Sequence, residues 1–241
     1  MCDMRVLVIT GAGVSAESGI PTFRGKDGFW RNLDPAKLAT PEAFAKNPGL
    51  VWDWYRERRQ RIREAQPNPA HEAIVRLAAN AGEFLLVTQN VDDLHLRAKA
   101  EGQQLSQERV VQIHGDIFVT RCSRCDCSRR EYEREQEDGD LPKCRECGEL
   151  MRPGVVWFGE QLEMQKIECV ENYLVRGSCD VVIVAGTTAA FGYVIDWALR
   201  AHERVGQLIE VNPDPTPLSP FATRLIREPA GVALPRLVNE L

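Results

Sequence analysis

The chain has 241 residues, a formal net charge of -5 and 44% apolar residues, an ordinary composition for a soluble globular protein. This charge gives no support for binding to nucleic acid or a membrane surface, and no apolar run is long enough to span a bilayer. The first strand is expected directly after residue 5, which leaves no room for a signal peptide, so we expect a cytoplasmic protein.

A glycine-rich loop follows the first expected strand, which covers residues 6–10. Residues 11–16 read Gly-Ala-Gly-Val-Ser-Ala, a G-x-G-x-x-A form of the dinucleotide-binding fingerprint. In that fingerprint Gly11 permits the tight turn and Gly13 lets a phosphate approach the backbone. Residues 19–21 read Gly-Ile-Pro and interrupt the next helix, whereas a dehydrogenase continues to a second strand ending in Asp or Glu. The loop therefore predicts a dinucleotide site without hydride transfer.

Strands and helices alternate along much of the remaining chain. Further buried strands are expected at residues 84–88, 110–113, 181–185 and 208–211, and helices at 69–81, 162–175 and 191–204. The alternation predicts an α/β fold with a doubly wound, Rossmann-type parallel sheet. We expect residues 1–30, 68–117 and 154–241 to form this domain. A helical insertion at 31–67 and a zinc ribbon at 118–153 would form a smaller one.

Two cysteine pairs carry the metal prediction. Cys122-x-x-Cys125 and Cys144-x-x-Cys147 are separated by 18 residues, the spacing of a zinc ribbon. Four thiolates leave no open position on zinc, so the site is expected to be structural. A redox dithiol would place one pair at a helix N-terminus, which these polar, turn-rich segments do not favour. Cys127 could replace Cys125, although its spacing to a partner is wrong.

Polar side chains follow three of the expected strands. Residues 88–93 read Thr-Gln-Asn-Val-Asp-Asp, residues 114–116 read His-Gly-Asp, and residues 186–188 read Gly-Thr-Thr. Because ligands bind beyond the carboxyl ends of parallel strands, these groups are expected to converge on one crevice. His114 is a candidate general base or a structural cap of the following turn. Asn90 and Asp92 are candidate ligand contacts or helix N-caps.

The other histidines, His71, His95 and His202, fall within helical patterns and are expected to be surface or packing residues.

In this order, the motifs resemble the sirtuin family of NAD-dependent protein lysine deacylases. Residues 152–160, Arg-Pro-Gly-Val-Val-Trp-Phe-Gly-Glu, and 210–213, Glu-Val-Asn-Pro, extend the resemblance over nearly the whole chain. It implies that NAD and an acylated lysine enter a cleft between the two domains from opposite sides. It also implies acyl transfer to ADP-ribose, giving nicotinamide and O-acyl-ADP-ribose, with one structural zinc ion.

The resemblance also assigns individual roles. It makes His114 the general base on a ribose hydroxyl and places the nicotinamide carboxamide on Asp92. It places Val156 and Phe158 along the acyl-lysine tunnel, with the backbone of residues 155–159 pairing with the substrate peptide. The NAD-binding residues that it implies are Gly11, Ala12, Gly13, Ser15, Glu17, Thr22, Phe23, Arg24, Trp30, Gln89, Asn90, Val91, Asp92, Gly186, Thr187, Thr188, Asn212, Pro213, Asp214 and Ala230.

The acyl preference can be argued from a Tyr-x-x-Arg pair. Tyr55 and Arg58 match a segment of one sirtuin class, and residues three apart share a helix face. A hydroxyl and a guanidinium can bind a distal carboxylate, so succinyl and malonyl groups are expected beside acetyl. The alternative is a merely basic helix, since this segment holds five arginines: Arg56, Arg58, Arg59, Arg61 and Arg63.

The sequence also departs from the sirtuin pattern, and other functions stay open. The usual Gly-Thr-Ser is Gly-Thr-Thr, and residues 189–193 lack the proline often found there. One alternative function is an NAD-dependent protein ADP-ribosyltransferase, and another is a zinc-ribbon module that only senses NAD. The expected partners are acylated-lysine proteins, with no nucleic acid and no membrane, and the chain is expected to be a monomer.

Overall fold

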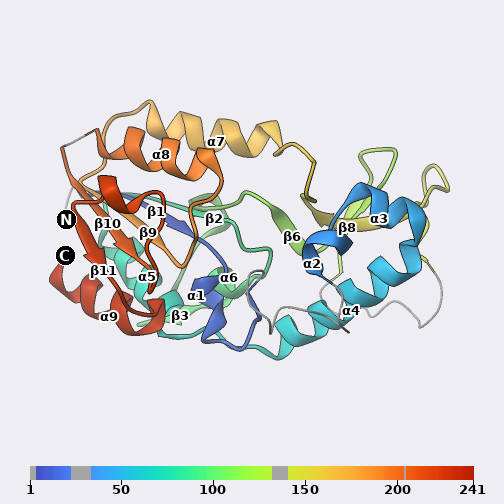
Figure 1. The fold of residues 1–241 in the computed structure, drawn as a ribbon, viewed down its shortest axis with the longest axis horizontal. Helices are drawn as coiled ribbons and strands as arrows, with labels where there is room; N and C mark the ends of the chain where they lie inside the picture. The colour runs from blue at the N-terminus through green and yellow to red at the C-terminus, as the bar shows by residue number, and fades with distance from the viewer. Residues whose placement is uncertain (1–3, 23–33, 132–140, 204) are drawn as a thin grey trace.

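A six-stranded, all-parallel sheet forms one end of the molecule (Figure 1). The computed structural model describes residues 4–22, 34–131, 141–203 and 205–241. The strand order is β11-β10-β9-β1-β2-β5, the doubly wound order of a Rossmann fold. The strands are β1 (Arg5–Thr10), β2 (Glu83–Thr88), β5 (Val110–Gln112), β9 (Val181–Ala185), β10 (Gln207–Val211) and β11 (Arg224–Ile226).

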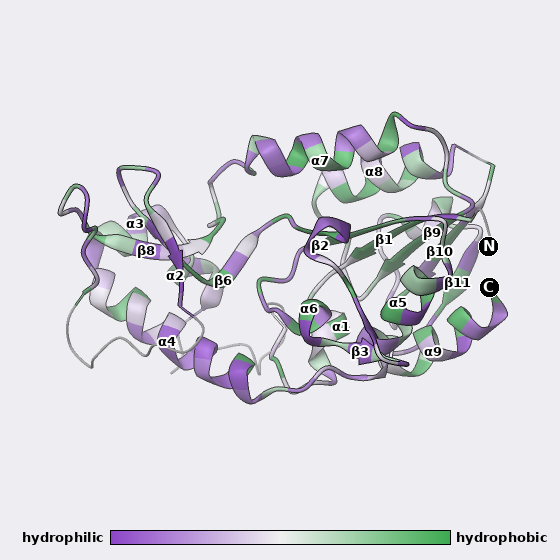
Figure 2. Ribbon diagram, turned by 180° about the vertical axis from the view of Figure 1, so that it is seen from behind, coloured by the Kyte–Doolittle hydropathy of each residue, from purple (hydrophilic) through white to green (hydrophobic). Residues whose placement is uncertain are grey.

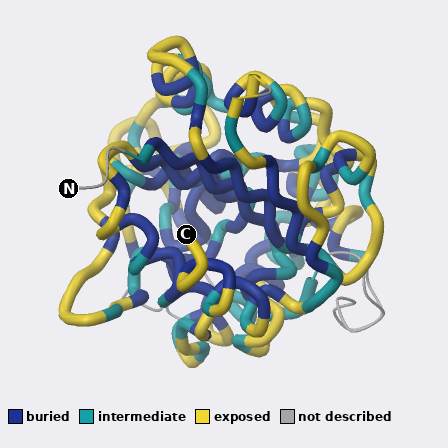
Figure 3. The backbone as a smooth tube through the Cα atoms, turned by 90° about the vertical axis from the view of Figure 1, so that its left-hand side faces the viewer, coloured by how far each residue is buried: buried dark blue, intermediate teal, exposed yellow. Residues whose placement is uncertain are grey.

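Helices cover both faces of this sheet, so its strands are buried on both sides (Figure 3). Helices α5 (Pro69–Asn80) and α9 (Ala230–Glu240) pack on one face, and α7 (Met164–Leu174) and α8 (Gly192–His202) on the other. Alternate residues of a strand point to opposite faces. Accordingly, Val6 and Val8 belong to one hydrophobic cluster, and Leu7 and Ile9 to the other.

The opposite end of the molecule contains helices and a three-stranded antiparallel sheet (Figure 1). Its core includes the buried rings of Trp52, Trp54, Tyr55, Phe118 and Trp157. Each of the three helices described in this part begins with proline at its first position and with a side-chain cap before it. The elements are α2 (Pro35–Leu38), α3 (Pro41–Lys46), α4 (Pro48–Glu64), β6 (Gly115–Cys122), β7 (Ser128–Arg130) and β8 (Met151–Val155).

Helix α4 is joined to β6 through a buried arginine. Arg59 donates to the carbonyl oxygens of Ile117 at 2.6 Å and Val119 at 3.1 Å, and it pairs with the buried Glu131. In Figure 2 the strands of the large sheet are mostly hydrophobic green, whereas the C-terminal half of α4 is hydrophilic purple. The arginine-rich helix is therefore partly a solvated surface and partly a structural anchor.

The predicted α/β fold is confirmed, with differences in detail. The sequence prediction missed β11, α9 and the hairpin of β3 (Lys99–Ala100) and β4 (Gln103–Gln104). The short helices α1 (Gly13–Ala16) and α6 (Leu94–Arg97) lie where the sequence indicates helices, after the glycine-rich turn and around His95. The expected boundaries at 117/118 and 153/154 fall inside β6 and β8. Within the described ranges, no helix is both long and apolar enough to cross a membrane.

Candidate active site

The glycine-rich loop after β1 packs directly on the loop after β9, where the sheet order reverses. Gly11 N donates to Ala185 O at 3.1 Å, and Gly13 N donates to Gly186 O at 2.8 Å. A Cβ atom on Gly13 would lie 2.8 Å from both the Cα and the carbonyl oxygen of Gly186. Gly186 itself has a φ of +61°, which a side chain disfavours. The glycines are thus needed for the contact between the two loops, in addition to the phosphate access expected from the sequence.

Side chains at neighbouring strand ends are hydrogen-bonded to one another at this edge of the sheet. Gln89 Nε2 donates to Thr187 Oγ1 at 2.9 Å, which joins the end of β2 to the end of β9. Asn212, which follows β10, donates from Nδ2 to the Thr187 carbonyl at 3.0 Å. The polar groups after β2, β9 and β10 therefore meet at one edge of the sheet.

Ser15 is the centre of a buried polar network behind this edge. Asn90 Nδ2 donates to Ser15 Oγ at 3.0 Å, and the Ser15 hydroxyl also bonds to the Asp92 carboxylate. Asn68 N donates to Nδ1 of His71 at 3.2 Å, so the hydrogen of this ring lies on Nε2, which faces Ser15 Oγ at 3.4 Å. With two donors already on its oxygen, Ser15 directs its own hydrogen toward Asp92.

Asp92 is buried, and burial raises the pKa of its carboxyl to about 6. Its Oδ1 accepts a hydrogen bond of 3.1 Å from Leu94 N, which opposes that rise in pKa. The N-cap residue of α6 is Asp93, so Asp92 is not the helix N-cap that the sequence left open, although it accepts from the first residue of the helix. Arg58 also favours the charged form, which connects Asp92 electrostatically to α4.

His114 lies between a carbonyl and a hydroxyl. Its Nδ1 is 3.0 Å from Gln89 O, which accepts but cannot donate, so the ring hydrogen lies on Nδ1. Its Nε2 therefore carries the lone pair and accepts from the Tyr193 hydroxyl at 2.7 Å. Burial lowers the pKa of His114, and the nearby Lys166 lowers it further, which favours the neutral ring.

The Tyr-x-x-Arg pair lies on α4 close to β8 and the segment after it. Tyr55 is buried and accepts a hydrogen bond of 3.0 Å from Trp157 Nε1, and burial raises the pKa of its hydroxyl. The Arg58 guanidinium lies 4.9 Å from the centre of the Trp54 ring. Burial lowers the pKa of Arg58, and the nearby Tyr55 and Asp92 oppose this change. The Arg58 cation thus stands close to both Tyr55 and Asp92.

The segment after β8 has most of its backbone donors in use. Val156 N donates to His114 O at 2.8 Å, and Phe158 N donates to Ala39 O at 2.9 Å. Trp157 N donates to Glu160 Oε2 at 2.8 Å. Trp157 is buried, whereas the Phe158 ring is 44% exposed. The backbone N–H groups of residues 156–158 are thus all engaged within the chain.

The remaining sequence-predicted NAD contacts lie in several different parts of the chain. Glu17 accepts from Gly231 N at 2.6 Å and so caps the start of α9, beside the buried Ala230. Phe23, Arg24 and Trp30 lie outside the described residues. Residues with partly or fully exposed side chains are Ala12, Thr22, Val91, Thr188, Pro213 and Asp214.

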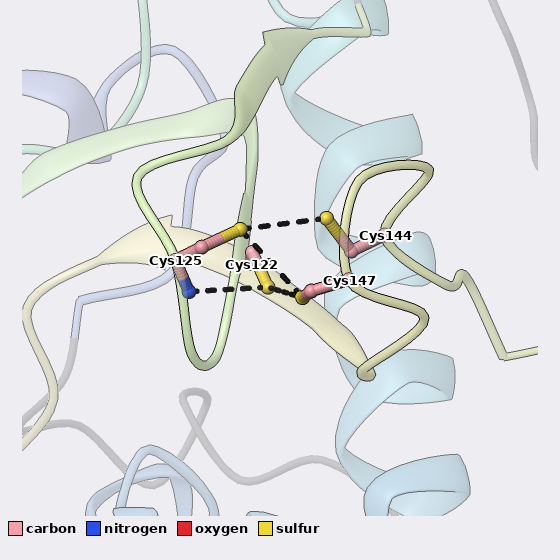
Figure 4. A group of neighbouring side chains, drawn as sticks. All are labelled: Cys122, Cys125, Cys144 and Cys147. Atoms are coloured by element: carbon pink, nitrogen blue, oxygen red, sulfur yellow. Dashed lines mark hydrogen bonds between the residues drawn. The ribbon is translucent and has the colours of Figure 1, made fainter.

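The four cysteines of the predicted zinc ribbon come together between β6 and β8 (Figure 4). Their sulfur atoms lie within 4.8 Å of one another, with 3.4 Å between Cys122 and Cys147 and 3.6 Å between Cys125 and Cys144. Zn–S bonds of about 2.3 Å in a tetrahedron place sulfurs about 3.8 Å apart. The cluster therefore fits a structural zinc ion. Cys127 packs beside the cluster and is not one of the four.

Three residues at the site were missed by the sequence analysis. His71, expected at the surface or in packing, is buried and bonded to Ser15. Trp157 donates a hydrogen bond to Tyr55, and Tyr193 forms one with His114. The only signal for Tyr193 was its place in the segment that departs from the sirtuin pattern.

Comparison with known proteins agrees with this geometry. The model of the Sir2 family matches residues 11–191. The NAD-dependent protein deacylase 1 of Archaeoglobus fulgidus is 45% identical over 236 residues, 98% of this chain and 92% of that protein. A solved Sir2 homologue in complex with 2'-O-acetyl ADP-ribose has a TM-score of 0.88 at 45% identity, covering 98% of this chain and 91% of its own.

A second solved structure, a Sir2 homologue in complex with NAD, has a TM-score of 0.87 at 44% identity. That alignment covers 99% of this chain and 90% of the other. The family model covers residues 11–191, the relative and the solved structures match almost the full length of the sequence, and the chain belongs to the Sir2 family.

Proposed function

We propose that this chain is an NAD-dependent protein lysine deacylase that transfers the acyl group to ADP-ribose and releases nicotinamide. The proposal is carried by the convergence of the residue 11–15 loop, the polar strand ends and His114 at the switch point of the sheet. Membership of the Sir2 family, whose relative in Archaeoglobus fulgidus is named an NAD-dependent protein deacylase, supports the same activity.

The proposed NAD site uses the backbone of residues 11–13 and 186–188, with Asp92 as acceptor for the nicotinamide carboxamide. Ser15 supports this role because its hydroxyl bonds to the Asp92 carboxylate, and Asn90 in turn holds Ser15 by donating to its oxygen. When bound, NAD supplies the ribose carbon to which the acyl oxygen bonds as nicotinamide leaves. We place this site between the larger domain (1–30, 68–117 and 154–241) and the smaller one.

His114 is the proposed general base. Its Nε2 has the lone pair because Nδ1–H donates to Gln89 O, so Nε2 can take a proton from a ribose hydroxyl. The lowered pKa of His114 keeps the ring neutral and able to accept that proton near neutral pH. The zinc ion held by the four cysteines has a structural role, since they leave no open position on the metal.

The acyl range is proposed to include succinyl and malonyl groups. The hydroxyl of Tyr55 accepts from Trp157 and keeps its own hydrogen for a carboxylate. Arg58 lies one turn further along the same helix and offers a positive charge to the same group. Acetyl-lysine lacks the distal carboxylate, so its turnover depends less on these two side chains.

Mass spectrometry of acetylated and succinylated peptides, with and without NAD, tests the activity. We expect NAD-dependent loss of both acyl groups and a product with the mass of acyl-ADP-ribose. The variant His114→Asn should abolish turnover of both peptides. Label from NAD that stays on protein, with no acyl-ADP-ribose formed, would instead establish the ADP-ribosyltransferase alternative.

A comparison of two arginine variants tests the acyl range. Arg58→Met should reduce kcat/KM for the succinyl peptide far more than for the acetyl peptide. Arg56→Met is the matched control, because Arg56 is on the same helix and pairs with Asp53 at 2.7 Å. Equal losses on both peptides in Arg58→Met would reject the proposed carboxylate site and leave the deacylase proposal intact.

A further inference from the structure

The candidate base already has a hydrogen-bond donor where its substrate hydroxyl must arrive. The Tyr193 hydroxyl lies 2.7 Å from Nε2 of His114, and Nδ1 is engaged with Gln89 O at 3.0 Å. A neutral imidazole has a single lone pair, so Nε2 accepts from one hydroxyl at a time. A ribose hydroxyl can therefore reach Nε2 only after the Tyr193 hydroxyl has moved away.

The Tyr193 ring is held in place from both sides. It stacks on Phe191 with ring centroids 5.7 Å apart and planes 13° apart, and it packs against Trp197 at 4.9 Å. Trp197 Nε1 donates to Glu171 on α7 at 3.0 Å, which anchors this column of rings to the neighbouring helix. In the free protein this packing places the Tyr193 hydroxyl on His114, and an arriving substrate hydroxyl has to displace the Tyr193 ring against these contacts.

We propose that Tyr193 is a positioning residue for His114: its hydroxyl caps Nε2 in the free enzyme and is replaced there by the substrate hydroxyl. The inference rests on the proposed role of His114 as general base. In the free enzyme the contact keeps the lone pair on Nε2 and excludes a competing donor from it. Binding exchanges one O–H donor for another, and no covalent bond changes in that step.

Among the residues that the structure describes, the polar and charged groups that act on the His114 ring are Tyr193, Gln89 and Lys166. Tyr193 is on α8, the Gln89 carbonyl follows β2, and Lys166 on α7 is paired with Glu163 at 3.0 Å. Donation by the Tyr193 hydroxyl stabilises the neutral ring, as burial and the charge of Lys166 also do, whereas the Gln89 carbonyl favours the charged ring. Removing the hydroxyl alone should therefore raise the pKa of His114 while leaving the other contributions in place.

Tyr193→Phe tests the proposal, because it keeps the stacked ring and deletes only the donor. The acid-side fall of kcat/KM for NAD reports the pKa of His114 in the free enzyme. The acid-side fall of kcat reports its pKa in the enzyme–substrate complex. We expect the acid limb of kcat/KM to move up by about 0.5–1 pH unit, the effect of one hydrogen bond, while the limb of kcat stays in place. A shift of both limbs would show that Tyr193 remains on His114 in the complex and would overturn the exchange.

Nitrogen-15 NMR titration of His114 in the free protein gives a readout that does not need turnover. The wild-type ring should show the hydrogen on Nδ1, and Tyr193→Phe should titrate about 0.5–1 pH unit higher. An unchanged titration overturns the proposal. Tyr173→Phe is the matched control, since the Tyr173 hydroxyl donates to Val6 O at 2.8 Å, and it should leave the His114 titration unchanged. If His114→Asn remains active, the proposed base is wrong, although the NMR result still decides whether Tyr193 caps the ring.

Discussion

The indole Nε1 of Trp157 donates a hydrogen bond of 3.0 Å to the hydroxyl oxygen of Tyr55. Both side chains are only 2% exposed, so this donor and acceptor depend on each other. The bond uses one lone pair of the Tyr55 oxygen and thereby restricts the directions in which the hydroxyl hydrogen can point. Burial raises the pKa of Tyr55, which keeps that hydrogen available for donation.

The first prediction concerns Trp157→Phe, which removes the indole donor and keeps an aromatic ring. Tyr55 then loses the contact that orients its hydroxyl, so recognition of a distal carboxylate should weaken. We expect kcat/KM for a succinyl-lysine peptide to fall about 5–10-fold, the effect of about one hydrogen bond. The value for the acetyl-lysine peptide should stay within about twofold, because acetyl presents no carboxylate to the hydroxyl.

Trp52→Phe is the control for this variant. Trp52 belongs to the same hydrophobic cluster, but its Nε1 donates to the carbonyl oxygen of Met151 at 3.0 Å. Losing that bond should lower stability and change the two activities by the same factor. A parallel loss of both activities in Trp157→Phe would show that the Trp157–Tyr55 bond supports only packing.

The sheet was predictable because its central strands are short, β-branched and apolar runs, which is typical of strands buried on both faces. The two elements at the end of the chain do not have this signal. Strand β11 has only three residues, and Arg224 and Leu225 in it are exposed. Helix α9 carries Pro235 in its interior, which argues against a helix in a sequence pattern. Tertiary packing on α5 and β10 overrides that preference.

The strand-end part of the site was predictable for a geometric reason, and the contacts around it were not. Parallel strands bring their carboxyl ends to one edge, so residues after β2 and β9 had to meet. The Tyr193–His114 bond joins residues 79 positions apart, and the Ser15–His71 contact joins residues 56 apart. Both contacts depend on how helices pack against the sheet, and no local sequence pattern predicts that packing.

The second prediction concerns removal of zinc. Cys144→Ser deletes one sulfur of the four-sulfur cluster, which should abolish stoichiometric zinc binding and destabilise the antiparallel sheet of β6, β7 and β8. A strong chelator should have the same effect on the unaltered chain. Metal analysis and a thermal melt measure both.

Cys127→Ser is the matched control for the metal site. Cys127 packs beside the cluster but is not one of its four sulfurs, so this variant should keep one zinc ion per chain. If Cys127→Ser loses zinc and Cys125→Ser retains it, Cys127 and not Cys125 is the fourth zinc ligand.

The third prediction concerns Gly13→Ala. The new methyl group would lie 2.8 Å from backbone atoms of Gly186 on the loop after β9. Backbone atoms cannot move aside as the end of a flexible side chain can. The two loops must separate, so we expect destabilisation by about 1–3 kcal/mol and at least tenfold weaker NAD binding. Urea unfolding and calorimetric titration with NAD give the two values.

Gly49→Ala is the control for the glycine variant. Gly49 is in the first turn of α4, and a methyl group there meets only the Asn47 side chain at 3.6 Å. Because alanine favours the helix, stability should be unchanged or raised by about 0.5–1 kcal/mol, with unchanged NAD binding. If Gly13→Ala behaves like Gly49→Ala, the close contact of the two loops is not required for the site.

The last prediction concerns the pH dependence of stability due to Asp92. Its pKa is raised by burial from 3.8 to about 6, so the folded state binds a proton that the unfolded chain has already released. For this group, stability is therefore highest at low pH and declines as the pH rises from about 4 to about 6. Asp92→Asn removes the ionisation and keeps a side chain of similar size.

The gain in unfolding free energy from Asp92→Asn, relative to the unaltered chain, should then be about 1–2 kcal/mol larger at pH 8 than at pH 5. Urea unfolding of both proteins at the two pH values, with equal zinc present, measures this difference and cancels the pH dependence of the metal site. A gain that is the same at both pH values would mean that Asp92 titrates alike in the folded and unfolded chains. In that case Arg58 and Ser15 would compensate the burial of the carboxylate fully.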